Sequence, residues 1–190
     1  MDQIENIIKS RRSVYPKYYI DKEISEETIL WLLDLANWAP THKKTEPWRF
    51  KVFHSKESRK QLGEYLASAF KESALSKGGA FPELKFQKTL KKPLQSGCVI
   101  AVCMQRDPLE RLPEWEEIAA VSCAVQNMWL AASTKGLGAY WSTPSSIIEA
   151  REFLQLKENE KCLGLFYIGY RNELEFGSSR GPIEDKISFM

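Results

Sequence analysis

The stretch that decides the fold is EWEEIAAVSCAVQNMWLAASTKGLGAYWST, residues 114–143. Residues 114–136 predict the longest helix of the chain, and Gly136 is a typical residue for ending it. Apolar side chains occupy most of the circumference of this helix. Such a helix lies at the centre of a protein or of an oligomer. The residues LGAYWST that follow predict a strand, so a central helix leads directly into the sheet.

The flanking sequence alternates between helical and extended patterns. Ser25 is a good N-cap for a helix that ends near Ala39, because Pro40 disfavours helical geometry in the residue before it. Ser55 caps the next helix in the same way. The remaining predicted elements are helices over 2–10 and 145–154 and strands over 48–54, 97–104 and 162–170. This intermixed order predicts a single α+β domain over 1–190, with a mixed sheet flanked by helices.

Two segments depart from this pattern. Residues 75–95 are rich in Lys, Gly and Pro, and we interpret them as a mobile excursion, with a short helix or a lid as alternatives. Residues 171–190 predict an extended, polar C-terminal tail with a few apolar anchors. Residues 75–95 do not look like a domain boundary, because the segments before and after them are too small to fold alone.

Composition excludes several classes of protein. The chain has 190 residues, 43% of them hydrophobic, and a net charge of +2 without a basic run, which disfavours a nucleic-acid partner. No apolar stretch approaches the roughly 18 residues of a membrane span, and the N-terminus does not resemble a signal peptide. The four cysteines lack metal-site spacing, and three lie in apolar runs, which favours reduced thiols in a cytoplasmic protein without a metal site.

Three separate places carry groups able to hold an aromatic, anionic ligand. The first is RRS, residues 11–13, because arginine offers bidentate donors and a permanent charge to a phosphate. The alternative is that these cations complement the C-terminal dipole of the first helix.

The second place is ANWAPTHKKTEPWRF, residues 36–50, which combines aromatic rings and cations at a helix-to-strand junction. Trp38 and His42 would be held in place by a turn at Pro40; a solvated surface loop is the alternative. The third place is GLGAYWSTPSS, residues 136–146. Here Trp141, Ser142 and Thr143 end a strand before a helix, and the alternative is a simple helix cap.

Taken together and in order, RRSVYPKY, ANWAP, EPWRF, AVQNMWLAASTKGLGAYWST, IGY and the final RGP resemble the nitroreductase family of flavin enzymes. The resemblance covers nearly the whole chain and is closest to the small NAD(P)H nitroreductase branch. It implies an α+β homodimer that binds one FMN per subunit at the subunit interface, with the long apolar helix packed against its twin.

The resemblance also implies roles for individual residues. Arg11, Arg12 and Ser13 form the first FMN-binding segment, and Arg180 of the C-terminal SSRGP grips the phosphate. Trp38 and His42 line the flavin, with His42 reaching toward the cofactor of the partner subunit. Trp141, Ser142 and Thr143 lie along the isoalloxazine. Residues 131–136 correspond to a segment associated with the nicotinamide nucleotide, although they also read as a plain helix end.

The sequence departs from the family at Lys44 and Glu46. Many members carry Asn and Gln at these two places, whose amides bond the pyrimidine ring of the flavin. Lysine only donates hydrogen bonds, and ionised glutamate only accepts them. We hypothesise that Lys44 places a positive charge beside the flavin and stabilises its reduced, anionic form; a lysine in solvent is the alternative.

The implied function is transfer of a hydride from NAD(P)H to a small acceptor, such as a nitroaromatic or a quinone, by a ping-pong mechanism on FMN. No residue is assigned as a catalytic acid or base. The alternatives are a specialised flavin dehydrogenase or dehalogenase of the same family, a flavin-binding protein without turnover, and an interaction domain without a cofactor.

Overall fold

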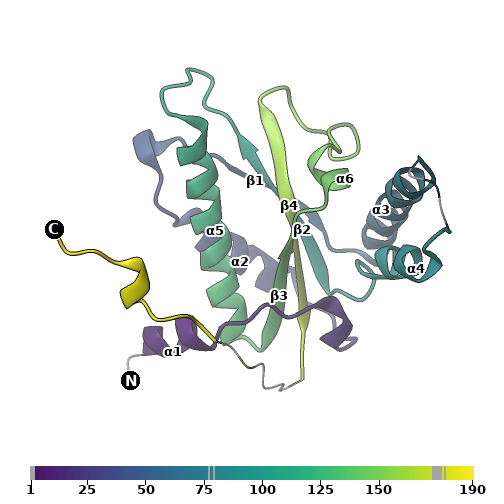
Figure 1. The fold of residues 1–190 in the computed structure, drawn as a ribbon, viewed down its shortest axis with the longest axis horizontal. Coiled ribbons are helices and arrows are strands. Elements are labelled where there is room, and N and C mark those ends of the chain that lie inside the picture. The colour runs from purple at the N-terminus through teal and green to yellow at the C-terminus, as the bar shows by residue number, and fades with distance from the viewer. Residues whose placement is uncertain (1–2, 77, 79, 173–176, 178) are drawn as a thin grey trace.

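The computed structural model describes residues 3–76, 78, 80–172, 177 and 179–190. A four-stranded sheet with the order β1-β2-β4-β3 forms its centre, and helices cover both faces (Figure 1). The strands are β1 (Trp48–Phe53), β2 (Cys98–Gln105), β3 (Leu137–Ser142) and β4 (Glu160–Tyr170). The α-helices are α1 (Gln3–Ser10), α2 (Glu26–Asn37), α3 (Lys56–Ser76), α4 (Glu83–Lys91), α5 (Glu114–Thr134) and α6 (Ser145–Ile148), and the 3₁₀ turns are η1 (Pro16–Tyr18), η2 (His42–Lys44) and η3 (Glu184–Lys186).

The two central strands, β2 and β4, are buried on both faces. This burial explains why their sequences are continuous apolar runs rather than alternating ones. One core lies between the sheet and helices α2 and α5, and includes Phe166 and Ile168. A second core on the other face includes Leu62 of α3 and Tyr167 of β4. Alternate residues of each strand therefore enter different cores.

The α+β architecture and the long helix before β3 are confirmed. All three strand pairs of the sheet are antiparallel, and the parallel pairing within the described residues is a single bridge from Ser13 to Ala139 at the free edge of β3. Ser13 and Val14, which follow α1, lie along this edge, so this part of the N-terminal segment is a neighbour of the strand that follows α5.

Two of the predicted helix starts are confirmed by their capping bonds. The Ser25 hydroxyl accepts from the Thr28 amide at 3.2 Å, and the Ser55 hydroxyl accepts from the Ser58 amide at 3.0 Å. The helix expected over 145–154 is wrong in length, because α6 ends at Ile148. After it the chain turns, and the Arg151 guanidinium donates to the main-chain carbonyls of residues 156, 157, 158 and 160.

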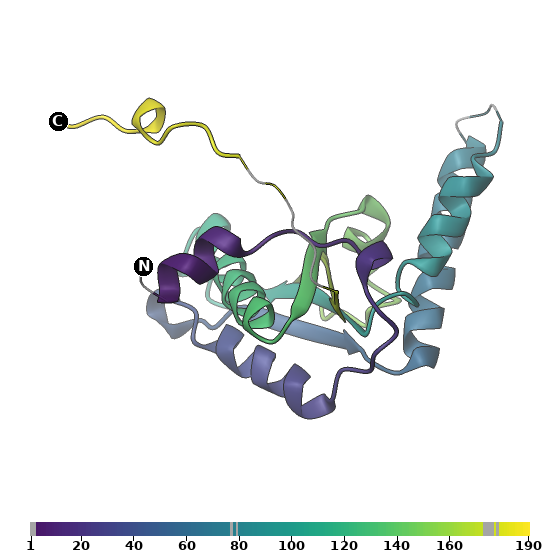
Figure 2. The ribbon, with the colours of Figure 1, turned by 90° about the horizontal axis from the view of Figure 1, so that it is seen from below.

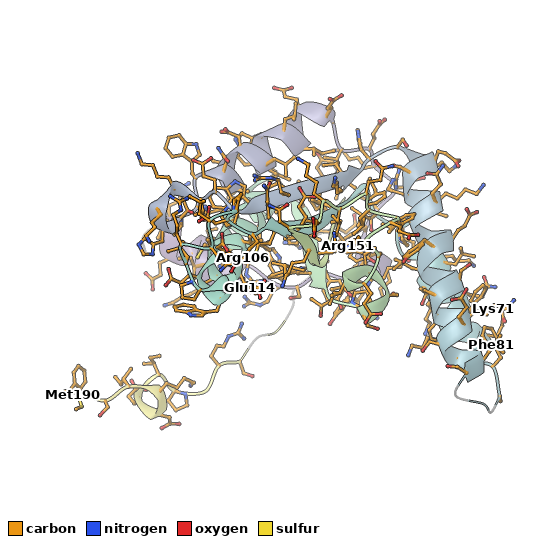
Figure 3. All side chains as sticks on the ribbon, turned by 90° about the horizontal axis from the view of Figure 1, so that it is seen from above. Lys71, Phe81, Arg106, Glu114, Arg151 and Met190 are labelled. Carbon is orange, nitrogen blue, oxygen red and sulfur yellow. The ribbon has the colours of Figure 1, made fainter. Side chains whose placement is uncertain are left out.

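Two parts of the chain extend from the sheet. Helix α4, which lies within residues 75–95, packs beside α3, and Lys71 and Phe81 mark the far end of this pair (Figure 3). The C-terminal segment around η3 projects away from the body on the side of α1 (Figure 2). None of the described helices combines the length and the apolar character needed to cross a bilayer.

Candidate cofactor-binding site

The first and third predicted places meet at the free edge of β3. The Val14 amide donates to the Ala139 carbonyl at 2.9 Å, next to the bridge formed by Ser13. Gly138 permits this approach, because a Cβ there would lie only 2.8 Å from Val14 Cβ. The structure thus brings RRS and AYWST side by side, although they are far apart in the sequence.

Arg11 lies against the C-terminal half of α5. Its guanidinium stacks over the Trp129 ring, 4.5 Å from the ring centroid. Its Nη1 atom is buried and has no hydrogen-bond partner among the described residues. Burial lowers the pKa of Arg11, and the positive charges of Arg12 and Arg180 lower it further. Two further guanidinium groups therefore repel that of Arg11, and an anion would relieve that repulsion.

Two tryptophans continue the site from Arg11 to the sheet. Trp129 packs edge-on against Phe166, and Trp141 lies opposite Phe166 in the β3–β4 ladder. The indole Nε1 atoms of both tryptophans are buried and have no partner within the described residues. Together with Arg11 Nη1 they are the three buried side-chain nitrogen or oxygen atoms without a partner in the described part of the chain. All three can only donate.

Gly164 is required beside this cluster. Its φ is +131°, and a Cβ there would lie 2.8 Å from the Trp141 Nε1 atom. A side chain at this position would therefore displace the Trp141 ring.

The remaining residues of these two places take different positions. Ser142 follows Trp141 and points to the opposite face of the sheet, where its hydroxyl accepts from Lys92 Nζ at 3.4 Å. Thr143 is exposed beyond the end of β3. The Arg12 guanidinium donates to the main-chain carbonyls of Lys9 and Arg11, and Arg180 is exposed in the C-terminal segment.

The second predicted place forms a strained turn at the other end of α5. Trp38 is 78% exposed, and His42 Nδ1 lies 2.8 Å from an oxygen of Glu116 in the first turn of α5. Lys44 and Glu46 are exposed, with φ values of 52° and 43°. Non-glycine residues rarely adopt positive φ, so this turn holds its side chains at a cost in conformational energy.

Helix α5 separates the turn from the arginine cluster. His42 contacts Glu116 near its beginning, whereas Arg11 contacts Trp129 near its end. At about 1.5 Å per residue, these two contacts are roughly 20 Å apart along the axis. Within one chain these residues therefore fall into two separate clusters, which we name the arginine half-site (Arg11, Arg12, Trp129, Trp141) and the turn half-site (Trp38, His42, Lys44, Glu46).

Sequence reasoning missed three residues at these places. Trp129 reads as a core position of an apolar helix, and only the fold puts Arg11 over its ring. Glu116 reads as a helix-start acid, and only the fold pairs it with His42. Lys92 is one of several lysines in a polar segment, and nothing in its spacing marks it as the lysine that reaches Ser142.

Buried donors without partners, beside three guanidinium groups on an antiparallel α+β scaffold, have the chemistry that suits an anionic ligand rich in hydrogen-bond acceptors. The chain belongs to the nitroreductase family, whose model matches residues 8–170. A protein of Bacillus subtilis named "Putative NAD(P)H nitroreductase YfhC" is 29% identical over 192 residues, covering 98% of this chain and 94% of that protein.

Solved structures share the fold. A nitroreductase-like family protein of Bacillus cereus has a TM-score of 0.83 and 30% identity, covering 100% of this chain and 97% of the other. A nitroreductase of Bacteroides fragilis with bound FMN has a TM-score of 0.73 and 20% identity, with 100% of both chains covered. These likenesses confirm the family resemblance and the fold expected from the sequence.

Proposed function

We propose that this protein is an FMN-dependent oxidoreductase that takes a hydride from NAD(P)H and reduces a small acceptor, such as a nitroaromatic or a quinone, by a ping-pong mechanism. FMN, when bound, accepts the hydride and passes the electrons on. The observation that carries this proposal is the set of three unpartnered buried donors in the arginine half-site.

The chemistry of these donors fits FMN. A buried donor without a partner costs free energy, which a ligand with acceptor oxygens recovers. FMN offers such oxygens on its phosphate, ribityl chain and ring carbonyls. In this proposal Arg11, Arg12 and Arg180 hold the phosphate, and Ser13 and Trp141 lie along the rest of the cofactor. The nitroreductase of Bacteroides fragilis and the name of the Bacillus subtilis relative support FMN and NAD(P)H, respectively.

The separation of the two half-sites supports a homodimer. If α5 packs antiparallel against α5 of a second copy, the start of one helix lies beside the end of the other. The turn half-site of one subunit then adjoins the arginine half-site of its partner. The outer side of α5 suits this contact, because Trp115 is 67% exposed and the exposed Ala119 and Cys123 near the middle are small. Small residues let two helices approach closely.

The C-terminal segment supports the same assembly. The part around η3 projects from the body on the side of α1 (Figures 1 and 2). Its apolar side chains Ile183, Phe189 and Met190 are exposed. Exposed apolar side chains on an extended segment gain free energy when they pack on another surface. In the proposed dimer this surface belongs to the partner subunit.

The test is the visible spectrum of the purified protein under anaerobic conditions, before and after addition of NADPH or NADH. We expect a flavin band that bleaches with one of the nucleotides and recovers when a nitroaromatic or a quinone is added. A band that persists would favour the flavin-binding protein without turnover. A protein that takes up no FMN would contradict the proposal.

A further inference from the structure

A groove with four lysines lies on the opposite face of the sheet from α5. It runs between α4 and the chain that follows Ser13, and its volume is about 640 Å³, within the range of small-molecule sites. The residues that line it include Tyr15, Lys17, Leu84, Lys88, Lys91 and Lys92.

The groove is strongly positive. The residues that line it include four lysines and no aspartate or glutamate. None of these lysines forms an ion pair with a carboxylate in the part of the chain that the structure describes. A concave surface with charge of one sign concentrates ions of the other sign. The charge therefore favours an anion.

Lys92 distinguishes this groove from an ordinary solvated face. Its Nζ atom lies over the rings of Tyr140 and Tyr167, at 4.5 and 4.3 Å from their centroids, and it donates to Ser142. It is only partly exposed, and burial lowers its pKa to about 8. A partly buried cation without a carboxylate partner leaves an electrostatic cost that a bound anion would offset.

The groove also has an apolar wall. Tyr15 is half exposed and its ring packs on Tyr140, with the centroids 4.5 Å apart. Leu84 of α4 is exposed on the other side. The stems of the lysines add further apolar surface. An anion with a flat apolar body would fill this space better than a simple inorganic ion.

A second depression lacks these properties. It lies among Arg106, Glu114 and Arg151 at the far end of the sheet, with a volume of about 600 Å³ (Figure 3). It is lined by charges of both signs, and several of them already have partners: Arg106 binds Glu117, Glu114 binds Lys161, and Arg151 donates to main-chain carbonyls. Its lining therefore lacks the charge of one sign that characterises the lysine groove.

We propose that the lysine groove binds a small aromatic carboxylate, with the carboxylate at Lys88, Lys91 and Lys92 and the ring against Tyr15. The groove and the arginine half-site lie on opposite faces of the sheet, so this ligand is a second ligand, separate from the FMN and the electron acceptor of the proposed function.

The test is calorimetric binding of 4-nitrobenzoate and of its uncharged analogue 4-nitrobenzamide to the FMN-loaded protein. The native protein should prefer the carboxylate by about tenfold. Replacing two exposed lysines of α4, in Lys88→Gln/Lys91→Gln, should weaken carboxylate binding about five- to thirtyfold and leave the amide unchanged. The matched control, Lys71→Gln/Lys85→Gln, removes the same charge outside the groove and should change binding less than twofold.

Equal affinity for the two probes, or no binding of either, would overturn the inference. Carboxylate binding that survives the groove substitutions but fails in the control pair would place the site elsewhere and would overturn it as well. Reduction of the flavin by NAD(P)H in the same preparation tests the proposed function separately, because it requires neither probe.

Discussion

Replacing Arg11 with methionine should separate cofactor affinity from the stability of the flavin-free protein. Methionine keeps the contact with the Trp129 ring but removes the guanidinium whose Nη1 atom is buried and unpartnered. A hydrogen bond to a charged group contributes about 1.5–3 kcal/mol, so FMN should bind about 10- to 150-fold more weakly. The substitution loses a cation–π contact of about 0.5–1 kcal/mol but also removes the cost of burying a cation. The free energy of unfolding of the flavin-free protein should therefore change by less than about 1 kcal/mol.

The assay is FMN titration by quenching of flavin fluorescence, together with urea unfolding of the flavin-free protein. Lys9→Met is the matched control, because it removes the same charge from the neighbouring turn of α1, where Lys9 pairs with Glu5 in solvent. It should change FMN affinity less than about threefold. Native affinity in Arg11→Met would refute the reasoning, since the unpartnered donor would then have no role in holding the cofactor.

Three further predictions address stability, assembly and pH. Glu117→Ala should lower the free energy of urea unfolding by about 3–5 kcal/mol, because buried Glu117 accepts from Arg106 and its loss leaves that cation unpaired; Glu117→Gln should cost less. A short bis-maleimide should cross-link Cys123, the exposed one of the four cysteines, to its twin, and Cys123→Ser should abolish the product; a monomer at every dose would contradict the antiparallel dimer. Binding of 4-nitrobenzoate should weaken as pH rises through about 8, where Lys92 loses its proton, and Lys92→Gln should remove that dependence.

The sequence predicted the elements whose patterns are local. The apolar runs of β2 and β4, the length of α5 and the N-caps at Ser25 and Ser55 all follow from short-range spacing and capping chemistry. The predicted length of the helix after Pro144 was wrong, because local propensity favours a helix that continues to residue 154. In the structure the helix ends at Ile148, and the Arg151 guanidinium donates to main-chain carbonyls of the turn that follows. Propensity is a weak predictor wherever a side chain offers the backbone other partners.

The candidate site was predicted as a set of residues but not as an arrangement. Motifs selected Arg11 and His42 as candidate site residues, yet nothing in their spacing shows that α5 keeps them roughly 20 Å apart in one chain. That distance depends on Arg11 reaching Trp129 and His42 reaching Glu116, and both contacts arise from packing between distant segments. Patterns along the chain report which chemistry is present, and tertiary packing decides which groups meet.

This separation gives a decisive experiment on the assembly. Consider a hybrid dimer in which one subunit carries Arg11→Met and the other carries Lys44→Gln. If each flavin is held by the arginine half-site of one chain and the turn half-site of the other, both substitutions fall on one flavin and the second site is fully native. The hybrid should then bind one FMN with native affinity and native midpoint potential. If both half-sites of one chain served the same flavin, neither site would be native. Lys44 is exposed in the turn half-site, and the contacts of the two half-sites with α5 are roughly 20 Å apart along its axis, so the first outcome is expected.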